Sequence, residues 1–333
     1  MHFYLIGIDY KTTPFDARER IYRSRKAIAY FLENDERRTS AALITCNRIE
    51  IYGISKDPGE AINHIDGFFA EFPDFAARAY TKYGKEEVFR HALRLACGIE
   101  SQIQGELQIL AQVKAWSDRG IFHPGLKQLW DEAISISEEL RFRAGLNDPS
   151  ENIATIAFHD LKKRLNIKQS ADIVVIGTGK IAELIAQYRQ DFFCINFIAH
   201  KNHEKAEALA RASGGRASLL IDLPRLLSGA DAVISATSSP HYILKKEHFF
   251  ALSKQRKSPL YLYDLAVPRD IEPAVRDIEG LVLRNLDDLS GAFDEHNRRK
   301  RKNIDLASCL VDEKLRNYAE RTYGKSYQNR NAA

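Results

Sequence analysis

The chain has 333 residues, of which 44% are hydrophobic and 28% are charged, proportions typical of water-soluble globular proteins. No apolar run approaches the roughly 20 residues that a membrane span needs, and the first residues do not read as a secretory signal. The net charge of +4 allows a nucleic-acid partner without requiring one. Four cysteines without metal-type spacing predict a reducing, cytoplasmic setting and no metal site.

The first part of the chain mixes short strands with helices. Alternation over residues 2–9 predicts a strand, 15–33 reads as a helix, and 41–54 as two strands around a polar turn. Further helices are expected over 58–71, 85–97, 106–119, 126–145 and 151–165. This α+β pattern indicates a first domain over residues 1–148, which we interpret as catalytic.

The pattern changes in the middle of the chain. An apolar strand at 172–176 leads through a glycine-rich turn into a helix, and strands at 195–199, 231–236 and 259–265 continue the alternation. This predicts a Rossmann-like, doubly wound, mostly parallel α/β sheet over residues 149–285. From about residue 286 a long helix is expected, so that 286–333 form a third segment.

The glycine-rich turn is a candidate dinucleotide site, because it matches G-x-G-x-x-A between a strand and a helix. Gly177 permits the tight turn, Gly179 lets a pyrophosphate approach the helix N-terminus, and Ala182 allows close helix packing. The candidate cofactor contacts are Gly177, Thr178, Gly179, Lys180, Ile181 and Ala182. The alternative is a glycine turn in a domain that binds no nucleotide.

The end of the next strand indicates which cofactor is used. An acidic residue there would bind the ribose 2′-hydroxyl of NAD, but the chain has His200 and Lys201 and no carboxylate before Glu204. Lys201 could pair with a 2′-phosphate, so the sequence favours NADPH. The alternative is that Lys201 is an exposed loop lysine.

The turn Thr45-Cys46-Asn47-Arg48 presents a thiol beside a guanidinium between the two strands of 41–54. A nearby positive charge lowers the pKa of a thiol and favours the nucleophilic thiolate, and Arg48 could also hold a substrate carboxylate. On the tetrapeptide alone, a buried cysteine that packs as a small hydrophobe is the favoured interpretation.

Two further stretches reverse that preference. Residues 98–114 follow a helix that carries His91, and residues 265–271 read LAVPRDI. With the TCNR turn, and in this order, they resemble the glutamyl-tRNA reductase family over about residues 1–315. The resemblance implies that Cys46 attacks the ester of glutamyl-tRNA and that NADPH reduces the thioester to glutamate-1-semialdehyde. This reaction begins the five-carbon route to tetrapyrroles.

The resemblance also assigns roles within the site. Thr45 and Arg48 would grip the glutamate moiety, and Ser101, Glu106 and Gln112 would recognise substrate, with Glu106 as partner for the α-ammonium group. His91 would polarise the carbonyl or assist proton transfer. Taken alone, His91 on an amphipathic helix is more often structural, and Ser101 is a cap or loop residue. We interpret Cys97 as packing.

The chain departs from the family at several points. Tyr10 stands where histidine is usual, and Glu138 and Glu139 replace basic residues, which weakens any phosphate-binding surface there. The sequence has room for the long helix but not for the family's dimerisation domain, so we expect a monomer or a weak homodimer through the C-terminal helix. The expected partners are glutamyl-tRNA and the downstream glutamate-1-semialdehyde aminomutase.

Two alternatives stay open. One is a paralogous reductase that uses Cys46 on another activated acyl group, and the other is a non-catalytic tRNA-binding or regulatory relative.

Overall fold

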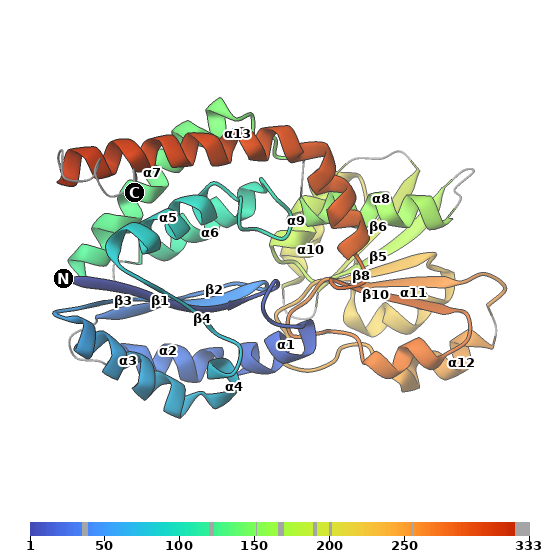
Figure 1. The fold of residues 1–333 in the computed structure, drawn as a ribbon. Helices are drawn as coiled ribbons and strands as arrows, with labels where there is room; N and C mark the ends of the chain where they lie inside the picture. The colour runs from blue at the N-terminus through green and yellow to red at the C-terminus, as the bar shows by residue number, and fades with distance from the viewer. Residues whose placement is uncertain are drawn as a thin grey trace. The chain divides into compact units, whose positions relative to one another are not determined.

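The structure, a computed structural model, describes residues 1–34, 39–119, 123–150, 152–165, 170–188, 192–199, 202–254 and 256–323. The chain divides into two compact units (Figure 1). Unit 1 combines Met1–Pro149 with His296–Ala333, and unit 2 is Ser150–Glu295. The first and last parts of the sequence therefore build one unit around the sheet that carries the TCNR turn.

Unit 1 contains a four-stranded antiparallel sheet in the order β2-β3-β1-β4. Its strands are β1 (His2–Asp9), β2 (Ser40–Ile44), β3 (Arg48–Ser55) and β4 (Tyr80–Tyr83). The βαββαβ order of strands and helices is that of a split βαβ fold. In β1, Tyr4, Ile6 and Ile8 join one apolar cluster and Phe3 and Leu5 join the other, so both faces of the sheet are buried.

Two sets of helices cover these faces (Figure 1). On one side lie α1 (Phe15–Arg23), α2 (Arg25–Glu33), α3 (Pro58–Glu71) and α4 (Pro73–Ala76). On the other lie α5 (Lys85–Ala96), α6 (Leu107–Ser117), α7 (Pro124–Arg143) and most of α13 (Ser290–Tyr323). The single helix predicted over 15–33 is wrong in one respect. It is two helices, because Ser24, with ψ near 3°, breaks the helical backbone between them.

Unit 2 holds a six-stranded sheet in the order β10-β9-β8-β5-β6-β7, in which every neighbouring pair is parallel. This is the 3-2-1-4-5-6 strand order of dinucleotide-binding folds, and it confirms the predicted doubly wound sheet. The strands are β5 (Ala171–Ile176), β6 (Phe193–Ala199), β7 (Arg216–Leu219), β8 (Ala232–Ser235), β9 (Leu260–Asp264) and β10 (Leu281–Asn285). The helices are α8 (Ile153–Leu165), α9 (Lys180–Gln187), α10 (His203–Ser213), α11 (Leu223–Gly229) and α12 (Phe250–Ser253), with short 3-10 turns at Leu220–Asp222, Lys246–Phe249 and Pro273–Asp277.

The long helix α13 begins at Ser290, four residues later than the sequence pattern suggests. Asn285 delays it, because its side-chain oxygen accepts the backbone N–H groups of Asp287 at 3.0 Å and Asp288 at 3.1 Å. Further along, the apolar residues of α13 are buried in the core of unit 1: Ile304, Ala307, Leu310, Val311 and Leu315. Across the described ranges, the structure has no helix that is long and apolar enough to cross a membrane.

Candidate active site

The TCNR turn is the tip of the hairpin between β2 and β3. The Thr45 N–H donates to the Arg48 carbonyl at 2.9 Å, which leaves Cys46 and Asn47 as the two tip residues. Cys46 is exposed, whereas Thr45 and Arg48 are buried. The Arg48 side chain is therefore buried at the start of β3, whereas Cys46 lies outside both strands, at the exposed tip of the hairpin.

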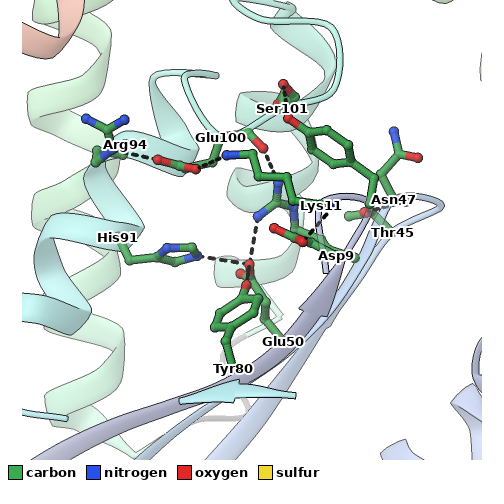
Figure 2. Close-up of polar contacts among 12 residues, drawn as sticks. Asp9, Lys11, Thr45, Asn47, Glu50, Tyr80, His91, Arg94, Glu100 and Ser101 are labelled. Atoms are coloured by element: carbon green, nitrogen blue, oxygen red, sulfur yellow. Dashed lines mark hydrogen bonds and ion pairs between the residues drawn. The ribbon is translucent and has the colours of Figure 1, made fainter. Parts of the chain in front are cut away.

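Arg48 belongs to a buried polar group centred on Glu50, which we call the Glu50 cluster (Figure 2). One Glu50 oxygen, Oε1, lies 2.7 Å from Arg48 Nη1, 2.5 Å from the Tyr80 hydroxyl and 2.9 Å from His91 Nε2. The other, Oε2, accepts the Tyr52 hydroxyl at 2.6 Å. Glu50 itself has no exposed surface.

The Glu50 carboxylate is held in its charged form. Burial alone would raise the pKa of Glu50, but the charges of His91 and Arg48, with hydrogen bonds from His91 and Tyr52, lower it well below its usual range. An ionised carboxylate only accepts hydrogen bonds, so Nε2 of His91 carries the proton in this contact.

Gly7 makes the space for this arrangement. It lies opposite Glu50 in the β1–β3 pairing. A Cβ atom there would lie 2.8 Å from the Tyr80 ring and 2.9 Å from Glu50 Cγ. Any larger residue would push Tyr80 off the carboxylate, so glycine is required at this position for packing.

A closed loop between α5 and α6, Gly98–Glu106, carries the next predicted residues, and we call it the site loop. The Gly105 N–H donates to the Gly98 carbonyl at 3.0 Å, and both glycines have positive φ angles, of 82° and 78°. Arg141 of α7 is fully buried and donates to the carbonyls of Cys97 at 2.8 Å and Gly105 at 2.7 Å. The two ends of the loop are therefore fixed by one side chain.

The site loop also contacts the strands through its backbone. Arg48 Nη2 donates to the Glu100 carbonyl, and the Tyr10 hydroxyl donates to the Ser101 carbonyl at 3.2 Å. Burial raises the pKa of Tyr10, so the hydroxyl keeps its proton for this bond at neutral pH. Tyr10, where the family usually has histidine, thus ties the loop to the end of β1.

The Glu100 side chain adds a second tie. It pairs with Lys11 and Arg94, both at 2.6 Å (Figure 2). Burial alone would raise the pKa of Glu100, but hydrogen bonds from Lys11 and Arg94 lower it to about 2. Near neutral pH, Glu100 is therefore ionised, and both of its carboxylate oxygens are already paired with cationic side chains.

Ser101 and Glu106 are the predicted site residues of this loop. Burial raises the pKa of Glu106 to about 7, although Arg48, the Ser101 hydroxyl and Arg141 oppose the shift. At neutral pH this carboxyl is close to half protonated, so its charge responds to any ligand that contacts it.

The thiol of Cys46 is mostly protonated in the free protein. Although the residue is exposed, surrounding protein atoms desolvate the thiol and raise the pKa of Cys46 to about 11. The charge of Glu106 raises it further, while those of Arg18 and Arg48 lower it. Arg48 does lower the pKa of Cys46, as the sequence predicts, but desolvation outweighs it, so Arg48 does not by itself produce a thiolate in the free protein.

The structure brings most of the predicted site residues together. Thr45, Cys46 and Arg48 line one crevice with Arg18 and Tyr22, and the site loop is bonded to Arg48 through Glu100. Ser101 and Glu106 lie on the site loop rather than in that crevice, and two further predicted residues lie elsewhere. Gln112 is on the exposed side of α6, in a hollow beside β2.

His91 is the second residue that lies apart. It faces a hollow of about 300 Å³ that Lys11 and Tyr80 also line, and in Figure 2 it approaches Glu50 from the side away from Thr45 and Asn47. The chain of bonds from His91 to the hairpin runs through Glu50 and Arg48.

Sequence reasoning missed several residues. Glu50 was identifiable, because it stands two residues after Arg48 in the apolar strand Arg48–Ser55 and so must share its buried face. Asn47 and Gln108 carry buried side-chain oxygens that have no hydrogen-bond partner among the described residues. Such oxygens can accept N–H groups of a ligand. Both lie in stretches that the sequence marks, Asn47 in the TCNR turn and Gln108 in residues 98–114, but local sequence does not show that their oxygens lack a partner.

Glu138 and Glu139, which replace basic residues of the family, form surface ion pairs. Glu138 contacts Lys114 of α6, and Glu139 lies 3.4 Å from Arg143 and 2.8 Å from Lys314 of α13. The two acids therefore link α7 to its neighbouring helices in addition to changing the surface charge.

The glycine-rich turn in unit 2 has the shape that a dinucleotide needs. Gly177 has φ of 113°, and a Cβ there would lie 2.6 Å from the Ala236 carbonyl oxygen. A Cβ on Gly179 would meet only that oxygen, at 3.9 Å, so the space over Gly179 is open at the start of α9. Ala182 is buried. These residues fit a pyrophosphate at the helix N-terminus. His200 and Lys201 lie outside the described residues.

The LAVPRDI stretch supports this edge of the sheet. Asp270 accepts the Ser235 hydroxyl at 2.7 Å, the Thr237 N–H at 2.8 Å and the Thr237 hydroxyl at 2.6 Å. Asp264 accepts the N–H of Ile271 at 2.8 Å. The stretch therefore fixes the segment after β8, against which Gly177 packs.

Comparisons with known proteins identify the family. The family model for the N-terminal domain of glutamyl-tRNA reductase matches residues 6–143, and that for shikimate/quinate 5-dehydrogenase matches residues 159–292. A relative named glutamyl-tRNA reductase, from Xanthomonas axonopodis pv. citri, is 31% identical over 98% of this chain and 78% of its own. The chain belongs to the glutamyl-tRNA reductase family. This confirms the identification made from the motifs.

Other relatives agree with this assignment. The glutamyl-tRNA reductase of Methanococcoides burtonii is 34% identical over 83% of this chain, and the match spans 65% of that relative's length. The solved glutamyl-tRNA reductase of Methanopyrus kandleri is 28% identical, with a TM-score of 0.50, over 96% of this chain and 80% of that one. Membership in the family, with a dinucleotide-binding fold in unit 2, implies an oxidoreductase that uses a nicotinamide cofactor.

Proposed function

We propose that this chain reduces glutamyl-tRNA to glutamate-1-semialdehyde with NADPH, through a thioester on Cys46, in the first step of the five-carbon route to tetrapyrroles. One observation carries the proposal: in a chain of this family, Cys46 at the hairpin tip lies in one crevice with Arg18 and Arg48, and the charge of Glu106 acts on its thiol. The same charges can orient the charged groups of an amino acid and can change the protonation state of the Cys46 thiol. We place the catalytic role at residues 1–148 and cofactor binding at 149–285.

The chemistry follows from the thiol. The Cys46 sulfur bonds to the ester carbonyl carbon, the bond from that carbon to the ribose oxygen breaks, and the departing tRNA hydroxyl takes a proton. A nicotinamide cofactor bound at the Gly177–Ala182 turn supplies hydride chemistry. Once the acyl carbon is reduced to the aldehyde, the Cys46 sulfur leaves as a thiolate and is ready for another cycle.

We infer that substrate activates the thiol through Glu106. The α-ammonium group of the substrate pairs with the Glu106 carboxylate, which removes one of the charges that keep Cys46 protonated. Asn47 and Gln108, whose buried oxygens lack partners among the described residues, are further candidate acceptors for N–H groups of the substrate. The thiolate then forms mainly when glutamate is in place, which limits side reactions of the free enzyme.

The other predicted residues keep supporting roles in this proposal. Arg48 uses Nη1 and Nη2 on Glu50 and Glu100, and its remaining N–H donors, with Thr45, stay assigned to the glutamate moiety. His91 is fixed by Glu50, so we assign it to proton transfer or to polarising the substrate carbonyl. Gln112 keeps its predicted contact with substrate.

The test is NADPH oxidation with charged glutamyl-tRNA, compared with free glutamate and uncharged tRNA. We expect oxidation with the charged tRNA alone. Activity on other activated acyl compounds but not on glutamyl-tRNA would favour the paralogous reductase, and tRNA binding without turnover would favour the regulatory relative.

The nucleophile is tested with Cys46→Ser and the matched control Cys309→Ser, which alters another exposed cysteine. Without NADPH, acyl label should accumulate on Cys46 of the wild type and be lost in Cys46→Ser, whereas Cys309→Ser should behave as the wild type. We expect no label on Cys97, because burial raises the pKa of that thiol to about 12. Label there would contradict the mechanism.

The preference for NADPH over NADH rests on Lys201. We expect Lys201→Asp to erode the preference, because the change removes a cation and adds a charge that repels the 2′-phosphate. Equal use of both cofactors by the wild type would show that Lys201 does not contact the phosphate. We further propose a cytoplasmic location and transfer of the aldehyde to glutamate-1-semialdehyde aminomutase, which co-purification of the two proteins would test.

A further inference from the structure

The site loop has a third tether, which comes from the far end of the sequence. Asn297, near the start of α13, contacts the loop with both ends of its side-chain amide. Its Oδ1 accepts the backbone N–H of Gln104 at 3.0 Å, and its Nδ2 donates to the carbonyl of Gln102 at 3.0 Å. Asn297 belongs to the same compact unit as the loop, although 193 residues separate it from Gln104.

This contact matches the chemistry of an asparagine side chain. The amide offers one donor and one acceptor side by side, and residues 102 and 104 of the loop present one acceptor and one donor. One side chain thus satisfies two backbone groups that no helix or strand pairs. Alanine or leucine would leave both without this partner, and an ionised aspartate could accept from the Gln104 N–H but could not donate to the Gln102 carbonyl.

Packing brings α13 close enough for the contact. A Cβ on Gly105 would lie 3.6 Å from Ile304 Cδ1 and 2.9 Å from Leu146 Cδ2, so the loop backbone rests on α13 and on the end of α7. Ile304 is buried in the core of unit 1. The apolar contact sets the distance, and Asn297 fixes which backbone groups face the helix.

The tethered segment lies between the two functional residues of the loop. Gln102 follows Ser101 directly, and Gln104 precedes Glu106 by two residues. Arg141 holds only the ends of the loop, at Cys97 and Gly105, and Tyr10 and Arg48 hold the carbonyls of Ser101 and Glu100. Among the described residues, Asn297 is therefore the side chain that fixes residues 102–104 from the α13 side.

We propose that Asn297 is a positioning residue, whose amide clamp on Gln102 and Gln104 holds Ser101 and Glu106 in place at Cys46. The inference rests on the proposed function only in giving that position a catalytic purpose. It makes α13 a part of the active-site architecture. Without the clamp, the loop keeps its fixed ends but residues 101–106 sample other positions, and Glu106 no longer acts steadily on the thiol.

Asn303 provides a matched control on the same helix. Its Nδ2 donates to the carbonyls of Ala144 at 2.7 Å and Gly145 at 3.4 Å, at the end of α7. Asn303→Ala therefore removes a comparable tie between α13 and the end of α7 without touching the site loop. A purely structural role for Asn297 predicts that the two alanine variants behave alike.

The first experiment follows the thiol and needs no turnover. Asn297→Ala, Asn303→Ala and Glu106→Gln are made in the full chain, and alkylation of Cys46 is followed by mass spectrometry against pH. The pKa of the Cys46 thiol should fall in both variants, because Glu106→Gln removes the Glu106 charge and Asn297→Ala lets that charge move away from the thiol. At pH 8 we expect alkylation about 2- to 10-fold faster, which corresponds to a fall of about 0.3–1 pKa unit. Asn303→Ala should match the wild type.

Hydrogen exchange gives an independent readout. The Gln104 amide donates to Asn297, so peptides covering 99–106 should exchange faster in Asn297→Ala and remain as in the wild type in Asn303→Ala. If alanine at 297 prevents folding, Asn297→Ser supplies the same comparison with a small polar side chain. Equal thiol profiles and equal exchange in the 297 and 303 variants would overturn the proposal.

Kinetics then separate this inference from the proposed function. With glutamyl-tRNA, Asn297→Ala should lower kcat for reduction by about tenfold, with unchanged binding of NADPH. A wild type without any reductase activity would refute the proposed function while leaving the thiol and exchange results interpretable. An Asn297→Ala enzyme with wild-type kcat would refute the positioning role alone.

Discussion

At the scale of single residues, the site is built around a carboxylate that does not face the thiol. Glu50 is fully buried and receives bonds from Arg48, Tyr52, Tyr80 and His91. This fixes the inner side of the hairpin that carries Cys46. The pKa of the thiol depends on desolvation and on the charges of Glu106, Arg18 and Arg48. Arg48 therefore acts on both the Glu50 carboxylate and the thiol.

We predict that Glu50→Gln lowers the free energy of unfolding by roughly 3–5 kcal/mol, because it leaves the Arg48 charge buried without its partner. Tyr52→Phe removes a single hydrogen bond to the same carboxylate and should cost about 1.5–3 kcal/mol. Urea denaturation of both variants at pH 7 measures the difference. Equal costs would show that the Arg48–Glu50 pair adds nothing to the fold.

Glu50 also predicts how the stability of the fold depends on pH. The pKa of Glu50 is lowered on folding, so its contribution to stability is present above the unfolded value of 4.5 and is lost as the pH falls towards the folded value. The wild type should therefore lose more stability than Glu50→Gln between about pH 5 and pH 2. Parallel acid-denaturation curves for the two proteins would contradict this.

Glu106 predicts the opposite trend. Its pKa rises from 4.5 to about 7 on folding, so its contribution to stability is fully present below 4.5 and is lost as the pH rises through 7. We expect Glu106→Gln to match the wild type near pH 4 and to exceed it by about 1–3 kcal/mol near pH 8. Thermal unfolding at the two pH values tests this, and Glu100→Gln, at a carboxylate whose pKa is lowered, should show no such gain.

At the scale of elements, the turn between β5 and α9 separates fold requirements from cofactor requirements. Gly177 needs its positive φ and has the Ala236 carbonyl against it, whereas Gly179 has open space beside it. Gly214, at the end of α10, has φ of 73°, and a Cβ on it would meet no atom within 4 Å. These three glycines therefore differ in what alanine would disturb.

We predict that Gly179→Ala leaves stability nearly unchanged but weakens NADPH binding at least tenfold, because the new methyl group occupies the approach of the pyrophosphate. Gly214→Ala should cost about 1 kcal/mol through its strained φ and leave NADPH binding unchanged. Fluorescence titration with NADPH and denaturant melts give both quantities. Unchanged NADPH affinity in Gly179→Ala would show that the cofactor does not use this turn.

At the scale of the whole molecule, the apolar stripe of α13 is already covered. Ile304, Leu310, Val311 and Leu315 are buried in unit 1, and of the large apolar residues of this helix whose side chains are described, Leu306 is exposed. Arg298, Arg299, Arg301 and Lys302 are exposed on the same helix and would repel a parallel copy. On the part of α13 whose side chains the structure describes, little apolar surface is therefore left for a second chain.

We predict that this 333-residue chain is monomeric at micromolar concentration, since a stable homodimer usually buries at least about 1,200 Å². Light scattering over a tenfold range of concentration measures the mass. A dimer mass independent of concentration would contradict the prediction, and Leu306→Glu would then test whether α13 carries the contact.

The sequence by itself determined the doubly wound sheet, most of the helices and strands, and the position of the thiol, because local periodicity and glycine spacing report on strands, helices and turns. It did not predict the short strands Tyr80–Tyr83, Arg216–Leu219 and Leu281–Asn285. It also determined the family, through motifs whose order is specific. Even Glu50 was within reach, since alternation places it on the face of Arg48.

Only the tertiary structure decided how these groups act on one another. The pKa of Cys46 depends on desolvation and on Glu106, which stands 60 positions further along the chain, and neither is visible in the TCNR turn. Gly7 matters because Tyr80 crosses over it, and Asn297 matters because α13 returns to the site loop. Such contacts join segments that are distant in sequence, and packing rather than local pattern selects them.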